Sequence, residues 1–224
     1  MKSKFFYILI LIIGIIILVY PVISNKLAEK AETDLIVKYN DEVGKMSQED
    51  VEQMKKEAIT YNKELDSQEK ITSNYMDLLK VGEIIGYIDI PKINVYLPIY
   101  HGTSDYILSK GVGHIETTSL PVGGSSTHAV LAAHTGFSRA ILFSNLHKIK
   151  LEDIFYIHIL DESLKYKVEQ IKIIDPENAE DLKYLEVQEE RDLVTLMTCS
   201  RIGVNKYRLL VTGSRVEDTQ EMYY

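Results

Sequence analysis

The feature that most constrains this chain is a run of 19 residues without a charge, FFYILILIIGIIILVYPVI from Phe5 to Ile23. As a helix this run is about 28 Å long, close to the hydrocarbon thickness of a bilayer. We therefore predict that residues 1–23 form an N-terminal transmembrane signal anchor. The alternative is a cleaved signal peptide that begins with MKSK, but the apolar core of such peptides is usually about 7–15 residues long. Val22-Ile23-Ser24 is also a weak cleavage site.

The lysines beside the span do little to orient it, because Lys2 and Lys4 precede it and Lys26, Lys30 and Lys38 follow it. Four residues before the span and the rest of the chain after it are typical of a signal anchor. We expect a single-pass protein of the cell membrane with the following domain outside the cell.

Residues 24–80 have the composition of a helical stalk exposed to solvent, with 13 acidic residues and 9 lysines. One helix is well marked. Ser47 stands three residues before Asp50, as in an N-terminal capping box. A stripe at helical spacing follows, so we expect this helix to pack on the domain behind it; the stripe is Val51, Met54, Ala58 and Tyr61.

From residue 81 to 215 the sequence changes to short runs rich in β-branched and aromatic residues, separated by Gly, Pro and polar clusters. Several runs are apolar on consecutive residues, which indicates strands covered on both faces or a closed barrel. We predict a mainly β fold, a small barrel with short helices, followed by a polar tail over 216–224. Seven runs read as strands: EIIGYIDI, INVYLPIY, HAVLAAH, DIFYIHIL, LKYKVEQIKII, DLVTLMTC and KYRLLVTG.

The net charge and the cysteine content limit the functions that the chain can have. The net charge of −8 argues against nucleic acid as a partner, because proteins that bind it carry basic stripes. Cys199 is the single cysteine, so it forms no disulfide within the chain. A free thiol is only about 3% thiolate at neutral pH, so a nucleophilic Cys199 needs a base or a positive charge nearby.

His134 is the most promising partner among six histidines, because AVLAAHTG indicates an apolar strand that stops at this residue. Cys199 also ends an apolar run, and strand ends of a barrel meet at one rim. Taken alone, each residue has a structural explanation, a hydrogen-bonded histidine and a buried thiol. His101, His114 and His128 lie in Gly- and Thr-rich contexts, for which we expect satisfied surface roles.

Arg208 begins the run RLLVTG nine residues after Cys199, a separation expected across a hairpin. A guanidinium there would favour the thiolate and could donate to the oxyanion of an acyl intermediate. A surface arginine paired with a carboxylate is the alternative. The spacing of Cys and His predicts no metal site, and Gly123-Gly124 leads into a strand rather than a phosphate-binding helix, so we expect no cofactor.

Taken together, TLMTC from Thr195 to Cys199, a histidine 65 residues upstream and an arginine shortly downstream resemble the signature of sortases, whose motif is TLxTC. Three longer segments resemble class C sortases, the branch that polymerises pilins. They are GYIDIPKINVYLPIYHGTS, GVGHIETTSLPVGGSSTHAVLAAHTG and TLMTCSRIGVNKYRLLVTG.

The resemblance implies an eight-stranded sortase barrel and a cysteine transpeptidase outside a Gram-positive membrane that needs no cofactor. It makes Cys199 the nucleophile, His134 the general acid and base, and Arg208 the residue that binds substrate and stabilises the oxyanion. In the family, the thiolate cleaves an LPxTG-like sorting signal between Thr and Gly. Class C enzymes then join the acyl group to a lysine amine of a pilin.

The sequence departs from the class C pattern before the barrel and beside the proposed site. Residues 62–82 contain no proline, so the Asp-Pro-aromatic lid motif is missing and we assign no lid residues. HTGFS replaces the usual HRGLP, and Tyr207 replaces a histidine often found before the arginine.

We considered three alternatives to a pilin polymerase. A sortase that anchors proteins to peptidoglycan precursors and a membrane-tethered β-domain without enzymatic activity both stay open. A papain-like protease is disfavoured, because its cysteine lies near the mature N-terminus with the histidine far downstream.

Overall fold

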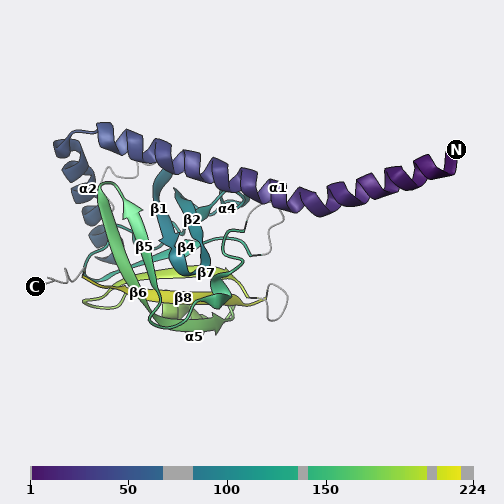
Figure 1. Cartoon of the computed structure of the whole chain (residues 1–224). Helices are drawn as coiled ribbons and strands as arrows, with labels where there is room; N and C mark the ends of the chain where they lie inside the picture. The colour runs from purple at the N-terminus through teal and green to yellow at the C-terminus, as the bar shows by residue number, and fades with distance from the viewer. Residues whose placement is uncertain (1, 68–82, 136–140, 201–205, 218–224) are drawn as a thin grey trace, which may run out of the picture.

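The structure is a computed structural model that describes residues 2–67, 83–135, 141–200 and 206–217. Eight strands form a closed barrel, and two long helices lie along its outside (Figure 1). The strands are β1 (Ile84–Ile90), β2 (Val95–His101), β3 (Val112–His114), β4 (Thr127–Ala132), β5 (Ile154–Ile159), β6 (Glu162–Ile174), β7 (Asp192–Cys199) and β8 (Arg208–Arg215).

Neighbouring strands follow the order β1-β2-β3-β4-β7-β8-β6-β5, and β5 closes the barrel on β1. Most pairs are antiparallel, but β2 with β3 and β4 with β7 are parallel. The parallel β4–β7 pair has a direct consequence for the site, because both strands end at the same rim of the barrel. The mainly β fold predicted from the sequence is confirmed.

The barrel interior is filled by one alternate set of side chains from each strand. On β4, β7 and β8 this set includes Ala129 and Leu131, Val194 and Leu196, and Val211. The other set on these strands faces outward. Each of the seven runs that we predicted as strands contains a strand. We did not predict β3, because its three residues are too few to show a pattern.

The helix α1 (Lys2–Lys45) contains the whole apolar run and is long and apolar enough to cross a membrane. Its N-terminal part extends away from the barrel, whereas its C-terminal part lies against β1 and β2 (Figure 1). Ile36 and Tyr39 are buried there, and the Tyr39 hydroxyl donates to the Ile85 carbonyl at 3.0 Å and accepts from the Leu160 amide at 2.7 Å. The region after the span is therefore helical and mostly exposed, and Ile36 and Tyr39 attach it to the barrel.

The helix α2 (Gln48–Ser67) begins where the sequence predicted. The Ser47 hydroxyl accepts from the Asp50 amide at 3.1 Å, and Val51, Ala58 and Tyr61 of the predicted stripe are buried. Asn62 fixes the far end, since its side-chain amide accepts from the Leu120 amide at 2.7 Å and donates to the Leu120 carbonyl at 3.1 Å. The helix thus packs on the barrel, as expected.

Short helical segments complete the described chain. They are η1 (Pro91–Ile93), α4 (Asp105–Leu108), η2 (Leu146–Lys148), α5 (Ala179–Leu182) and η3 (Lys183–Leu185). The last two belong to the connection from β6 to β7, which passes over the outward face of β4 and β7: the Glu186 carbonyl of this connection lies 2.8 Å from the His128 ring.

Candidate active site

The three residues predicted to carry chemistry lie at one rim of the barrel, on three adjacent strands. Cys199 is the last residue of β7 and pairs directly with Arg208, the first residue of β8. His134 follows β4, which runs parallel to β7 in the register Ala132 to Met197, and the Ala133 amide continues this ladder by donating to the Met197 carbonyl at 3.1 Å. If this register is continued by two residues along both chains, His134 comes level with Cys199.

The register also places the three side chains on the same face of the sheet. Cys199 alternates with the core residue Leu196 and the buried Thr198, and so it shares its face with Met197. Partners directly opposite in an antiparallel pair have Cβ atoms about 4.5–5.5 Å apart, which brings Arg208 next to Cys199. His134, Cys199 and Arg208 therefore form one row across the outward face.

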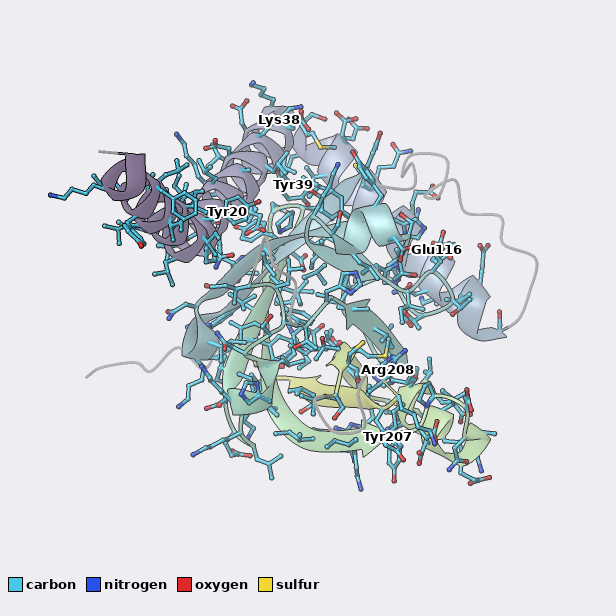
Figure 2. All side chains as sticks on the ribbon, turned by 90° about the vertical axis from the view of Figure 1, so that its right-hand side faces the viewer. Tyr20, Lys38, Tyr39, Glu116, Tyr207 and Arg208 are labelled. Atoms are coloured by element: carbon cyan, nitrogen blue, oxygen red, sulfur yellow. The ribbon has the colours of Figure 1, made fainter. Side chains whose placement is uncertain are left out.

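All three side chains are partly exposed, whereas the rows behind them are mostly buried. Cys199 is a free thiol. Figure 2 shows Tyr207 and Arg208 at the start of β8, away from α1. A partly exposed thiol beside a guanidinium and an imidazole has the access and the electrostatic environment that a nucleophile needs.

A cavity of about 560 Å³ opens at this rim beside Cys199. Its wall is mainly apolar, with Lys172 and His147 as ionisable side chains besides the thiol. Sequence reasoning missed these two residues, because they are brought to the rim only by the path of β6 and η2. The lining residues are Thr135, Phe143, Leu146, His147, Ile149, Ile171, Lys172, Ile173, Thr198, Cys199, Ser200 and Leu209.

A second cavity of about 560 Å³ lies further along the outward face, between the end of α2 and the β6–β7 connection. His128 lies at its base in a buried chain of hydrogen bonds. Its Nδ1 donates to the Glu186 carbonyl at 2.8 Å, so its Nε2 accepts from the Thr195 hydroxyl at 2.7 Å, which in turn accepts from Thr212 at 2.7 Å. Burial lowers the pKa of His128.

His101 and His114 form a second buried histidine site, at the parallel β2–β3 pair. Their Nδ1 atoms are 3.2 Å apart, and His114 Nε2 is 2.9 Å from the Ser119 carbonyl. A carbonyl only accepts, so His114 Nε2 carries the proton and its Nδ1 accepts from His101. His101 Nε2 is then a bare, buried lone pair with no hydrogen-bond partner among the described residues; the Glu116 carboxylate is 3.8 Å away.

The expectation of surface roles for His101, His114 and His128 was wrong, because all three are buried in strands. The neighbouring Gly and Thr residues suggested exposed turns, but here they flank short buried strands. Burial lowers the pKa of His101 and, together with the neighbouring His101 ring, that of His114 to about 4.

The segment that lacks the lid motif spans residues 62–82, and residues 68–82 of it lie outside the described residues. Within the described part of the same segment, Leu65 near the end of α2 lines the second cavity.

Comparison with known proteins assigns the family. A model of the sortase domain matches residues 88–216. Among curated proteins, sortase D of Bacillus subtilis is 29% identical over 61% of this chain and 66% of its own length. Sortase A of Listeria monocytogenes is 26% identical over 99% of this chain and 95% of its own length.

Solved structures of sortase C are more similar in sequence. Sortase C of Clostridium perfringens, solved with the C-terminal cell wall sorting motif, is 42% identical with a TM-score of 0.76, over 83% of this chain and 99% of its own. Sortase C of Streptococcus pneumoniae is 41% identical with a TM-score of 0.73, over 82% and 97%. With a domain model that matches more than half of its length and sortase C structures that share about 40% of its residues, the chain belongs to the sortase family and to its class C branch.

Proposed function

We propose that the chain is a membrane-anchored transpeptidase that cleaves a sorting signal and transfers its acyl part to a lysine amine of a pilin. The row of His134, Cys199 and Arg208 at one rim carries this proposal. It supplies a nucleophile, a proton carrier and a cation within reach of one another, as acyl transfer through a thioester requires.

The first half of the reaction makes the thioacyl enzyme. The Cys199 thiolate attacks the carbonyl carbon of the Thr–Gly bond in an LPxTG-like peptide, and the Arg208 guanidinium donates to the oxyanion that forms. The His134 imidazolium gives its proton to the glycine nitrogen as the carbon–nitrogen bond breaks. The peptide that begins with glycine leaves, and the acyl group stays on sulfur.

The second half reverses these roles. The neutral amine of the acceptor lysine attacks the thioester carbonyl, and His134 takes the proton that the nitrogen loses. The carbon–sulfur bond breaks, the thiolate of Cys199 is restored and an isopeptide bond remains. Because a thioester is reactive toward amines, the two halves need no cofactor.

The outward face of β4 and β7 is the proposed path of the sorting signal. Next to the proposed catalytic row this face carries Ala132 and the partly exposed Met197, which are small or apolar side chains. The complex of C. perfringens sortase C with the cell wall sorting signal supports a sorting-signal peptide as the donor.

The apolar helix α1 supports a membrane anchor, with the barrel outside the cell where sorting signals and acceptors meet. An acceptor assay separates the pilin reaction from anchoring to peptidoglycan. The full chain in detergent is incubated with a sorting-signal peptide and either a pilin subunit or a peptidoglycan-like amine. Covalent pilin ladders that are absent with Cys199→Ala are expected; product with the peptidoglycan-like amine alone would replace the pilin proposal by the anchoring one.

A further inference from the structure

A third cavity, of about 450 Å³, lies between α1 and the barrel near the end of the apolar run. One wall comes from α1, and the other from the start of β2 and from Ile141 and Leu142. None of its lining residues lines the cavity at Cys199. The α1 wall consists of Val22, Asn25, Lys26, Ala28, Glu29, Glu32 and Thr33, and the barrel wall of Asn94, Val95, Tyr96, Leu97, Ile141 and Leu142.

The cavity exists because α1 presents polar side chains to the barrel over this stretch. Further along the same helix Ile36 and Tyr39 are buried, and Tyr39 is hydrogen-bonded to β1. Where Glu29 and Glu32 line the cavity the space stays open, and the barrel wall of the cavity includes the apolar Val95 and Leu97. The result is a cavity with one charged wall and one apolar wall.

The charged side chains follow a fixed order away from the membrane. Val22 belongs to the predicted span, which ends at Ile23. At a rise of about 1.5 Å per residue, Lys26 lies about 5 Å beyond the span, and Glu29 and Glu32 lie about 9 and 14 Å beyond it. The polar layer on each side of the hydrocarbon is about 5–8 Å thick, so Lys26 is at headgroup depth, Glu29 is just outside it and Glu32 is about two helical turns further from the span than Lys26.

Within the part of the chain that the structure describes, neither Lys26, Glu29 nor Glu32 forms an ion pair. Glu32 is half-buried, and burial and the nearby Glu29 raise its pKa to about 7. A carboxyl group in this position gains from any cation that enters the cavity.

The order of groups matches that of a phospholipid whose headgroup ends in an amine: acyl chains in the bilayer, then a phosphate, then an ammonium. We propose that this cavity binds such an aminophospholipid, with Lys26 paired to the phosphate, Glu29 and Glu32 paired to the ammonium, and the apolar wall in contact with the upper part of the acyl chains. The site depends on the membrane anchor proposed above, but not on the proposed chemistry at Cys199.

The contact has a structural route to the proposed catalytic row. Ile141 and Leu142 in the cavity wall directly precede Phe143, whose amide donates to the His134 carbonyl at 3.1 Å. A lipid in this cavity therefore packs against the segment that fixes the backbone of His134.

The full chain is reconstituted in nanodiscs of phosphatidylglycerol alone or of phosphatidylglycerol mixed with phosphatidylethanolamine. After release into mild detergent, native mass spectrometry counts the lipids that stay bound. We expect one phosphatidylethanolamine per chain from the mixture and no retained phosphatidylglycerol. The Glu29→Gln/Glu32→Gln variant should retain about tenfold less, since it loses charge-assisted hydrogen bonds.

Asp34→Asn is the matched control, because Asp34 is exposed on the same stretch of α1 and does not line the cavity. It should retain lipid like the unaltered chain. Lys26→Glu tests the phosphate contact separately and should also lose lipid. Cleavage of a sorting-signal peptide in detergent should be unchanged in all variants, which shows that they fold and separates this proposal from the proposed catalysis. Equal retention of both lipids, no retained lipid, or unchanged retention in the double variant would overturn it.

Discussion

The buried pair of His114 and His101 should make the stability of the barrel depend on pH between 6.5 and about 4. His114 is fully buried, and its Nε2 donates to the Ser119 carbonyl. Its pKa is lowered from 6.5 to about 4 by burial, and an unfolded chain restores the ordinary value. The unfolded chain therefore binds more protons, so stability is complete above pH 6.5 and is lost as the pH falls toward 4.

The size of the effect follows from the pKa shift. One pKa unit corresponds to about 1.4 kcal/mol, so the shift of His114 corresponds to about 3 kcal/mol, of which about 2 kcal/mol is lost by pH 5. His101 acts in the same direction, because burial also lowers its pKa. The nearby Glu116 opposes this change, since its carboxylate favours a proton on His101.

The assay is urea unfolding of the full chain in detergent at pH 7, 6 and 5, followed by the fluorescence of its 15 tyrosines in the absence of tryptophan. His114→Gln keeps a donor for the Ser119 carbonyl but cannot titrate. Between pH 7 and 5 the unaltered chain should lose about 2 kcal/mol more than this variant. His147→Gln, at an exposed position, is the control and should keep the full dependence. Parallel pH profiles for the unaltered chain and His114→Gln would refute the reasoning.

Three further predictions concern the proposed site and the docking of α1. Alanine at Cys199, His134 or Arg208 should remove most peptide cleavage and leave the circular dichroism spectrum unchanged. Arg208→Lys should also cleave poorly, because an ammonium group lacks the planar fork of a guanidinium. Near-full turnover in any of the alanine variants would contradict the role assigned to that residue. Iodoacetamide should alkylate Cys199 in the native chain, since the thiol is partly exposed, and resistance until unfolding would indicate a structural thiol. Tyr39→Phe leaves the Leu160 amide without its acceptor and should lower the free energy of unfolding by about 1–3 kcal/mol in urea titrations, whereas an unchanged value would show that this hydrogen bond is dispensable.

The sequence predicts the barrel well where its strands are long. Runs such as DLVTLMTC are apolar on consecutive residues, because the outward face of β7 is also covered, and this pattern identified them. The three-residue β3 has no such pattern, and the parallel pairings of β2 with β3 and of β4 with β7 depend on contacts between distant segments.

The candidate site was predictable in part. Cys199 and Arg208 are separated by a hairpin distance and do pair, so local spacing was sufficient for them. His134 needed the parallel register of β4 and β7, which only the fold provides. The docking of α1 could not be predicted, because only a few residues such as Ile36 and Tyr39 make the contacts, within a segment rich in charged residues.

The most direct test of the proposed chemistry is mass spectrometry of the acyl enzyme. The full chain is mixed with an LPxTG-like peptide, quenched in acid and digested. We predict that the segment containing Cys199 gains the mass of the peptide up to its threonine, that hydroxylamine removes this mass, and that Cys199→Ala forms no adduct. Peptide cleavage without an adduct on Cys199, or with an adduct on another residue, would contradict a mechanism through this thiol.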